Sequence, residues 1–295
     1  MKKYLFITLF LTFASSASAQ LLWQVSGNGL EKPSYLFGTY HLVSEEFIDS
    51  VPGLNDAILS VDQVMVEIEE AILSSPDMTY QLAMECVTPA DSTLDVLLNA
   101  DDYKLVDNMM SAYMGMPGAL KFFNNVKPAV ISAQLEVMEA MKYFPDFDSS
   151  KQIDGAVERR ARNAGKPAYS LESVETQIAA LMGVPLEEQA QNLVEICRND
   201  SIFLEYNRQL VQAYRSQDLD AIWQLLNDDE MGGNDEGDLE RLIYGRNRAW
   251  VEKLVGELPL RSTLVCVGSG HLPGDQGLIA LLRGLGYTVK PYKQQ

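Results

Sequence analysis

The sequence predicts an α/β protein, a β-sheet flanked by helices, with a large helical insertion or cap. Apolar strand-like runs alternate with helical patterns in the first and last thirds of the chain, whereas residues from roughly 71 to 150 show helical spacing alone. The two outer thirds also resemble each other. Each contains an apolar run, a Gly-x-x-His-Leu turn and a helix, as a diverged two-half duplication would produce.

Residues 1–19 have the three parts of a secretory signal peptide: a Lys2-Lys3 pair, an apolar segment and small residues ending at Ala19. The apolar segment is about half of the ~20 residues that a membrane-spanning helix needs, and no later run reaches that length. We therefore expect a protein exported to the periplasm or secreted. Its mature part, residues 20–295, should form a single α/β domain with no transmembrane segment.

The composition narrows the classes of partner. With 41 acidic and 23 basic residues, the formal net charge is −18. A nucleic acid or an anionic membrane surface would require a basic face, so neither is expected as a partner. A hydrophobic content of 47% is enough to bury a large core.

The first third predicts strands at 21–25 and 34–38, joined by a turn through Gly27-Asn28-Gly29. A helix over 47–59 and a strand over 63–69 follow. The order strand, helix, strand is typical of a βαβ unit, which would make the strands at 34–38 and 63–69 parallel neighbours. Glu67 is out of place in the last part of such a buried strand, because a buried carboxylate is costly unless it has a partner.

From residue 151 the alternation returns. The pattern predicts strands at 167–171, 263–267 and 287–291, and helices at 153–163, 174–182, 186–197, 201–226, 239–258 and 278–285. The helix at 239–258 carries Arg246 and Asn247. Export would permit one disulfide among three cysteines. Because Cys266 lies inside an apolar strand, Cys86–Cys197 is the expected pair.

The chain has only two histidines, His41 and His271, and both end a Gly-x-x-His phrase that follows a strand. In open α/β sheets the functional crevice lies beyond the carboxyl ends of the strands, where His41, Glu67 and His271 all fall. Gly38 and Gly268 would let the backbone turn sharply there, at positive φ if needed. Two imidazoles and a carboxylate match the ligands of a divalent transition metal that activates water.

Each of these residues also has a structural interpretation. Either histidine could be a hydrogen-bonded structural residue, and Glu67 could be half of a buried ion pair with Arg246 or Arg261. A serine nucleophile is disfavoured, because the chain has no Gly-x-Ser-x-Gly phrase and Gly268-Ser269-Gly270 places its serine next to the wrong glycine.

An ordered set of phrases resembles the TraB/GumN family over nearly the whole mature chain. The set comprises Gly38-Thr39-Tyr40-His41-Leu42, the strand 64–67, Leu171-Glu172 with Gln177, Arg246-Asn247, the run 267–277 with its Gly-Ser-Gly-His-Leu core, and Gly286-Tyr287-x-Val289. That family is related to the TIKI metalloproteases and, more distantly, to the erythromycin-esterase and ChaN-like folds.

The resemblance implies an α/β fold in which both Gly-x-x-His motifs serve one active centre. In TIKI proteins these motifs and a glutamate support Mn²⁺- or Co²⁺-dependent peptide cleavage, which would make His41, Glu67 and His271 metal ligands here, with Zn²⁺ as a further candidate. Glu67 could instead act as a general base. Arg246 and Asn247 match an element that faces the same cleft, where they would steady an oxyanion or a substrate carboxylate.

Three hypotheses follow for the function. The first is an exported metal-dependent hydrolase, a peptidase, acting on a peptide or small-molecule substrate through two histidines and one glutamate. The second is a metal-free esterase with a histidine as general base, as the esterase relatives suggest. The third is a protein that binds or sequesters a peptide without cutting it, as some members of the family are described to do.

Overall fold

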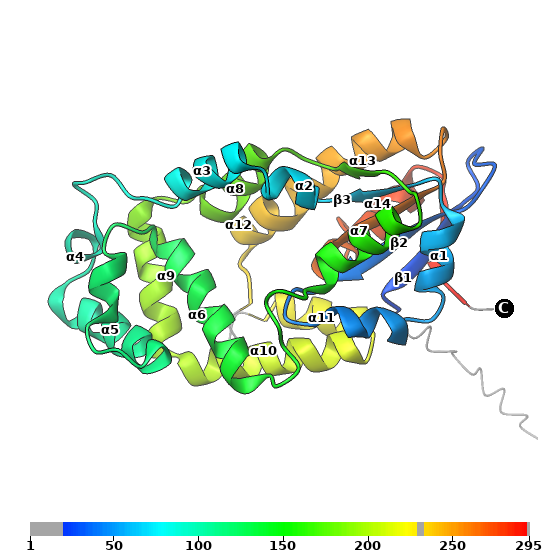
Figure 1. The fold of residues 1–295 in the computed structure, drawn as a ribbon. Helices are drawn as coiled ribbons and strands as arrows, with labels where there is room; N and C mark the ends of the chain where they lie inside the picture. The colour runs from blue at the N-terminus through cyan, green and yellow to red at the C-terminus, as the bar shows by residue number, and fades with distance from the viewer. Residues whose placement is uncertain (1–19, 229–232, 294–295) are drawn as a thin grey trace, which may run out of the picture.

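The structure is a computed structural model that describes residues 20–228 and 233–293. Its centre is a six-stranded sheet in the order β4-β3-β5-β2-β1-β6 (Figure 1). The strands are β1 (Leu22–Ser26), β2 (Ser34–Thr39), β3 (Gln63–Val66), β4 (Ala168–Ser170), β5 (Thr263–Gly268) and β6 (Thr288–Pro291). β4, β3, β5 and β2 are mutually parallel, and β1 runs antiparallel to both β2 and β6. This mixed sheet with its many helices fits the predicted α/β class.

One expectation about the sheet is wrong. The strands β2 and β3 are parallel but are not neighbours, because β5 lies between them and pairs with both. The register sets Thr39 beside Gly268, and Val66 beside Cys266. Strands that are buried on both faces are apolar throughout, so the sequence does not specify which of them pair. The consequence for the site is that β2, β5 and β3 end side by side.

Within the described residues, fourteen numbered α-helices and four short helical turns flank the sheet or lie beyond one end of it. Those of the first half are η1 (Glu45–Ser50), α1 (Leu54–Ser60), α2 (Glu70–Leu73), α3 (Pro76–Glu85), α4 (Leu94–Leu97), α5 (Ala100–Met114), η2 (Ala119–Phe123) and α6 (Pro128–Tyr143). Those of the second half are α7 (Ile153–Asn163), α8 (Val174–Met182), α9 (Leu186–Arg198), α10 (Asp200–Arg215), α11 (Leu219–Leu226), α12 (Glu236–Leu239), the π-helical turn η4 (Glu240–Tyr244), α13 (Gly245–Glu257), η5 (Ser269–His271) and α14 (Leu278–Gly284).

The helix expected over 47–59 is divided into η1 and α1. The break falls at Val51-Pro52-Gly53, where Gly53 has a φ of 79°. A residue before proline avoids the helical region, and glycine adopts the left-handed conformation at little cost. The chain therefore ends one helix and begins the next at this point.

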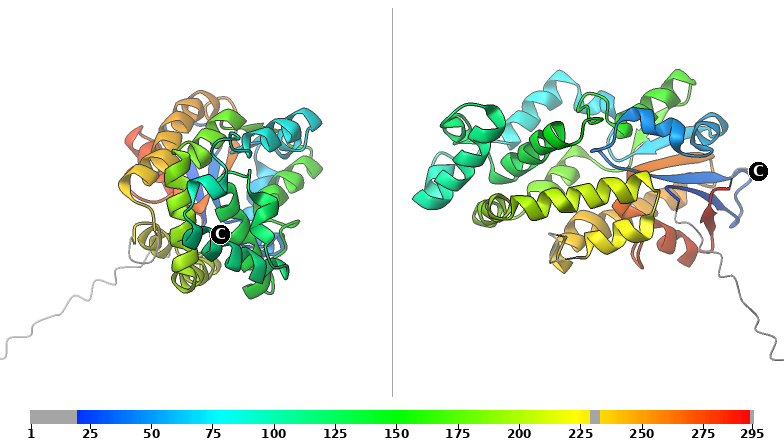
Figure 2. Two further views of the ribbon diagram at one scale, coloured as in Figure 1. Left: turned by 90° about the vertical axis from the view of Figure 1, so that its left-hand side faces the viewer. Right: turned by 90° about the horizontal axis from the view of Figure 1, so that it is seen from below.

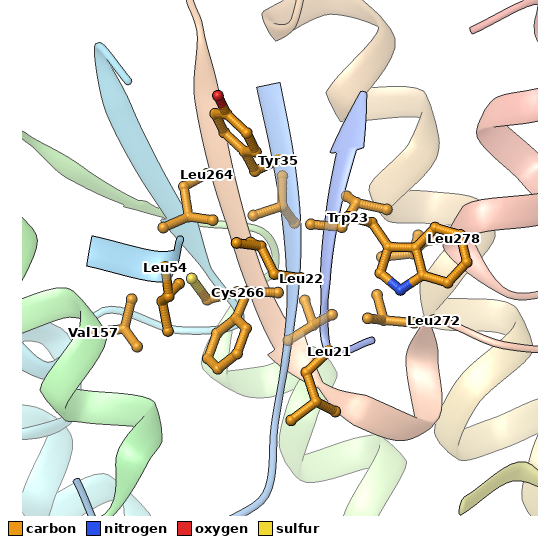
Figure 3. Close-up of a cluster of buried hydrophobic side chains, with 14 of the residues drawn as sticks. Leu21, Leu22, Trp23, Tyr35, Leu54, Val157, Leu264, Cys266, Leu272 and Leu278 are labelled. Atoms are coloured by element: carbon orange, nitrogen blue, oxygen red, sulfur yellow. The ribbon is translucent and has the colours of Figure 1, made fainter. Parts of the chain in front are cut away.

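Two hydrophobic cores hold the molecule together. The larger one lies on both faces of the sheet: Leu54 of α1 and Val157 of α7 lie on one side with Cys266, and Leu272 and Leu278 lie on the other (Figure 3). The two further views show the same layers, with α1 and α14 on opposite sides of the strands (Figure 2).

The smaller core belongs to a helical lobe, by which we mean α4, α5, η2, α6 and α9. These helices lie at the end of the molecule away from the sheet (Figure 1) and bury Leu94, Val106, Met110, Ile131 and Leu193 among themselves. Local sequence signals fit this arrangement. The Asn99 side chain accepts hydrogen bonds from two backbone N–H groups at the start of α5, and Gly115 ends that helix with a φ of 66°.

The expected Cys86–Cys197 disulfide is absent, and all three cysteines are free thiols. Cys197 packs inside the lobe core, where burial raises its pKa to about 12, and Cys86 follows the end of α3. Sequence spacing could not exclude the bridge, because a disulfide depends on the distance and direction of two Cβ atoms in the fold.

Within the ranges that the structure describes, no helix is long and apolar enough to cross a bilayer. The proposed signal peptide, residues 1–19, lies outside these ranges.

Candidate active site at the strand ends

A cavity of about 710 Å³ opens beyond the carboxyl ends of β2, β3 and β5. His41, Glu67, Arg246 and His271 all line it, although they come from distant parts of the chain. His41 and Glu67 follow β2 and β3, His271 ends the turn after β5, and Arg246 enters from α13. The parallel arrangement of these strands places their ends at one edge of the sheet, which is where α/β proteins bind ligands.

The two motif glycines serve this edge in a different way from the one expected. Neither has a positive φ. A Cβ at Gly38 would lie 2.9 Å from the Ser269 Cα, so Gly38 is required for the close approach of β2 to the turn that leads to His271. Gly268 donates its backbone N–H to Glu67 Oε1 at 2.8 Å. The glycines thus bring the strand ends and their polar groups together.

Arg246 is the centre of the charge network. Its Nη2 donates to Glu67 Oε2 at 2.5 Å and to Glu172 Oε1 at 2.6 Å, and its Nε donates to Glu172 Oε2 at 3.1 Å. The side chains of Arg246 and Glu172 are 8% and 4% exposed. One buried guanidinium therefore partners two carboxylates, one of them through two parallel bonds, an arrangement that fixes direction as well as charge.

The local backbone helps to aim this guanidinium. Arg246 stands just after the π-helical turn η4, and its Nη1 donates to the Leu242 carbonyl at 3.1 Å. Single π-turns within helices occur frequently at functional sites. The Trp250 ring, one turn later on α13, lies 4.7 Å from the guanidinium and donates its Nε1–H to Glu172. Arg246 is held from four directions.

Glu67 is ionised in this setting. Burial raises the pKa of its carboxyl, but the neighbouring His271, the Arg246 guanidinium and the Gly268 N–H together hold the pKa below the ordinary glutamate value. Gln177 of α8 adds a further hydrogen bond to Oε2 at 3.2 Å. Of the two ion-pair partners considered for Glu67, the structure has Arg246.

The hydrogen bonds around His271 define its tautomer. Asn247 donates its Nδ2 to two backbone carbonyls, those of His271 and Gln276, so its Oδ1 faces His271 Nδ1 at 2.8 Å. Nδ1 must then carry the proton, and Nε2 holds the lone pair that accepts from Arg246 Nη1 at 3.2 Å. Burial lowers the pKa of His271 to about 4, with Arg246 adding to the effect and Glu67 opposing it. The imidazole is neutral at neutral pH.

His41 lies apart from this network. Its side chain is exposed and its ring centre lies 5.6 Å from that of Tyr40. No hydrogen bond or ion pair joins it to Glu67 or His271 in the part of the chain that the structure describes. The cavity brings the two histidines to one space without placing them in contact.

Asp154, in the first turn of α7, also lines the cavity, and the sequence reasoning missed it. Its Oδ1 accepts a hydrogen bond from Thr39, whereas Oδ2 is buried with no hydrogen-bond partner among the described residues. Burial raises the pKa of this carboxyl, against an opposing effect of His41. Acidic residues are common in the first turn of helices because they interact favourably with the helix dipole, so nothing in the sequence distinguishes Asp154.

The donor types fit a divalent transition metal: a neutral imidazole at His271, an ionised carboxylate at Glu67, an accessible imidazole at His41 and an orphaned carboxylate oxygen at Asp154. Their arrangement is not that of a formed site. Glu67 Oε1 and His271 Nε2 are 4.0 Å apart, and no group of three His, Cys, Asp or Glu side chains within 20–228 and 233–293 is placed to hold an ion. Coordination by His271 Nε2 would displace Arg246 Nη1.

The family comparison covers the part of the chain that supplies these residues. The model of the TraB/PrgY/gumN family matches residues 21–291. The chain belongs to this family. The match spans both Gly-x-x-His motifs as well as Glu67, Arg246 and Asn247, so the residues that gather at the strand ends all fall within the TraB/PrgY/gumN region. No curated protein and no solved structure matches the sequence.

Proposed function

We propose that this TraB/PrgY/gumN protein is an exported hydrolase that cleaves a peptide. The observation that carries the proposal is the convergence of His41, Glu67, Arg246 and His271 on one cavity, with His271 neutral and Glu67 ionised. Segments separated by most of the chain supply these groups. Hydrolysis is the chemistry for which a basic nitrogen, a carboxylate and a guanidinium are commonly combined.

Arg246 is the candidate for stabilising negative charge that develops on the substrate. Its Nη1 donates to two neutral acceptors, the Leu242 carbonyl and His271 Nε2, while its other nitrogens hold carboxylates. Nη1 is therefore the donor that can turn to a substrate oxygen at the smallest electrostatic cost. Asn247 is fully buried, and its amide is committed to His271 and Gln276. We assign Asn247 the role of a positioning residue that fixes the His271 tautomer.

A metal ion would be held by His41, Glu67 and His271. Mn²⁺ or Co²⁺ is the first choice and Zn²⁺ the second, as the likeness to the TIKI metalloproteases suggests. When bound, such an ion lowers the pKa of its water and supplies hydroxide near neutral pH. The pKa values of His271 and Glu67 support a metal-dependent route. Both lie well below neutral pH, whereas a general base works best when its pKa is near the operating pH.

A second candidate function is peptide binding without cleavage. It is favoured by the way Arg246 already satisfies both Glu67 and the His271 lone pair, since a binder needs no free base. Metal-free hydrolysis, the third hypothesis, is less favoured because a histidine of pKa about 4 is a weak base at neutral pH.

The test uses residues 20–295 produced in a bacterial periplasm. Metal content is measured by mass spectrometry after incubation with Mn²⁺, Co²⁺ or Zn²⁺, and a mixed peptide library is followed for new termini. We expect about one bound ion, cleavage that stops with chelator, and loss of both in His41→Ala with His271→Ala. Glu67→Gln should also lose cleavage, and Glu187→Gln, an exposed change on α9, is its matched control.

The outcomes separate the candidates. Unchanged metal binding in the double histidine variant would overturn the proposed ligand set. Cleavage that survives exhaustive chelation would establish the metal-free route, and peptides recovered intact with metal bound would establish the binder. Secretion of a reporter fused behind residues 1–19, compared with the same fusion carrying Lys2→Glu and Lys3→Glu, tests export.

A further inference from the structure

A second cavity, of about 400 Å³, lies between the helical lobe and the helices next to the active site. Its walls come from α5, α6, α8, α9, α10 and η4. Four residues line both this cavity and the one at the strand ends: Glu136, Leu181, Tyr206 and Asn207. The two cavities therefore adjoin each other at these four residues.

The second cavity combines apolar walls with a buried carboxylate. Its apolar lining includes Met109, Leu135, Val184 and Phe203. Glu139 of α6 also lines it and is 8% exposed. Asn207 Nδ2 donates to Glu139 Oε2 at 2.9 Å, whereas Oε1 has no hydrogen-bond partner and no ion pair in the described part of the protein. A buried carboxylate that is half satisfied costs stability.

The surrounding charge makes this carboxylate more costly. The groups that act on Glu139 or respond to it are Glu136 on its own helix, Asp200 and Arg208 on α10, Tyr113 on α5 and Tyr40 after β2. Burial, together with Glu136 and Asp200, raises the pKa of Glu139, and Asn207 and Arg208 only partly offset this. The cation that lines the cavity, Arg241, is already bonded to Asp238 and to the Ala180 carbonyl.

Tyr40, which lines the first cavity and not the second, carries an unsatisfied hydroxyl group. The Tyr40 hydroxyl is buried and has no hydrogen-bond partner among the described residues. Its pKa is raised well above the ordinary tyrosine value by burial and by Glu136, Tyr206 and Glu139, so the neutral phenol faces these groups. Buried polar groups in native proteins are normally satisfied, so the unpartnered Tyr40 hydroxyl in the wall of the first cavity indicates room for a ligand atom there.

We infer that the second cavity binds a primary ammonium group of the substrate, with Glu139 as its counter-ion and the apolar walls around its carbon stem. The ammonium group of an organic cation would pair with the excess negative charge, and its carbon stem would contact the apolar walls. A hydrated inorganic ion could not make the second kind of contact. That the ammonium group belongs to a substrate rests on the proposed hydrolase function. It narrows the peptide to one that carries a lysine side chain or a free amino terminus at a fixed distance from the cleaved bond.

Binding is tested without catalysis, with phenethylamine as the cationic probe and 2-phenylethanol as its neutral isostere. Dissociation constants are measured by isothermal titration or saturation-transfer NMR on residues 20–295. We expect phenethylamine to bind at least tenfold more tightly. Glu139→Gln, which keeps an acceptor for Asn207, should remove that preference and leave 2-phenylethanol within about twofold. Glu205→Gln, an exposed change on α10, should alter neither constant.

A space-filling variant locates the probe. Ala133 lines the second cavity and not the first, so Ala133→Trp should abolish binding of both probes while the melting temperature reports that the protein is folded. Equal affinities for amine and alcohol, or binding that survives Ala133→Trp or Glu139→Gln, would overturn the inference. Amine binding with the expected variant pattern in a protein that cleaves nothing would support this site and count against the proposed hydrolase alone.

Discussion

Replacing Arg246 by methionine should expose how strongly the active site depends on one guanidinium. The change keeps much of the side-chain volume and leaves Glu67 and Glu172 without their shared cation. Glu67 would keep the Gly268 and Gln177 donors, and Glu172 would keep only the Trp250 N–H. Removing one partner of a buried ion pair typically costs about 3–5 kcal/mol, and we expect a loss near the lower end of that range because these donors remain.

The assay is urea unfolding at pH 7, with free energies obtained by linear extrapolation. The matched control is Arg160→Met, which removes an arginine from the exposed pair with Asp49, whose side chain is 61% exposed. Exposed pairs contribute only about 0–1 kcal/mol. A loss for Arg246→Met below about 1 kcal/mol, or no larger than the control, would refute the assignment of Arg246 as the buried counter-ion.

The pH dependence of the stability loss in Arg246→Met provides a second test. Without Arg246 the buried carboxylates can lower their cost by taking up protons, so the difference from wild type should narrow as the pH falls from 7 toward about 4.5. A difference that stays constant over that range would point to lost packing around Trp250 instead of lost charge pairing.

Three further predictions test other parts of the structure. In metal-free protein the NMR signals of the His271 ring should keep the chemical shift of the neutral imidazole down to about pH 5 and titrate near pH 4. Stability should fall as the pH drops from 6.5 to about 4, because His271 is protonated at a higher pH in the unfolded chain than in the folded protein. Glu139→Gln should raise the melting temperature at pH 7 by about 2–4 °C, which corresponds to roughly 1 kcal/mol of stability. Because the folded state raises the pKa of the Glu139 carboxyl, wild-type Glu139 becomes protonated as the pH falls, and the gain should vanish near pH 4. A destabilised Glu139→Gln variant would contradict this prediction. Gly274→Ala should cost about 1–3 kcal/mol, because its φ is 80° and a Cβ would lie 2.5 Å from the Trp223 ring, whereas Gly284→Ala, with no atom within 4 Å, should be neutral.

The sequence identified Glu67 as a carboxylate that needs a partner, but could not choose between Arg246 and Arg261. The direction of the strands determines which arginine can reach Glu67. Arg261 precedes β5 and donates to the Gln63 side chain at the amino end of β3, 3.3 Å away, so it lies at the opposite edge of the sheet from Glu67. Arg246 reaches the carboxyl edge because it lies in the first turn of α13, which begins at that edge and leads back to the amino end of β5. Only the order of the strands, which apolar patterning does not encode, fixes these positions.

The limits are similar for the rest of the site. The repeated Gly-x-x-His phrase predicted that His41 and His271 would lie near each other at strand ends. Both line one cavity, without direct contact. The hydrogen bonds that make His271 neutral come from Asn247 and Arg246, and their roles depend on side-chain direction along α13. Glu139 lies within an amphipathic helix pattern, where a charged residue ordinarily faces solvent. Its burial follows from the packing of α6 against α9, α5 and α8 and from the hydrogen bond to Asn207 of α10, which no sequence period encodes.

The buried acids at the strand ends and the one beneath the lobe are balanced in different ways. At the strand ends the protein supplies its own cation, and Arg246 neutralises part of the charge of Glu67 and Glu172 through a network that also holds His271. Beneath the lobe, Glu139 has an amide for a partner and acids for neighbours. Stability alone would favour glutamine at that position, because the amide contact would survive the change and the cost of the buried charge would disappear. The proposed ammonium ligand would offset this cost by supplying the positive charge that the described surroundings of Glu139 do not.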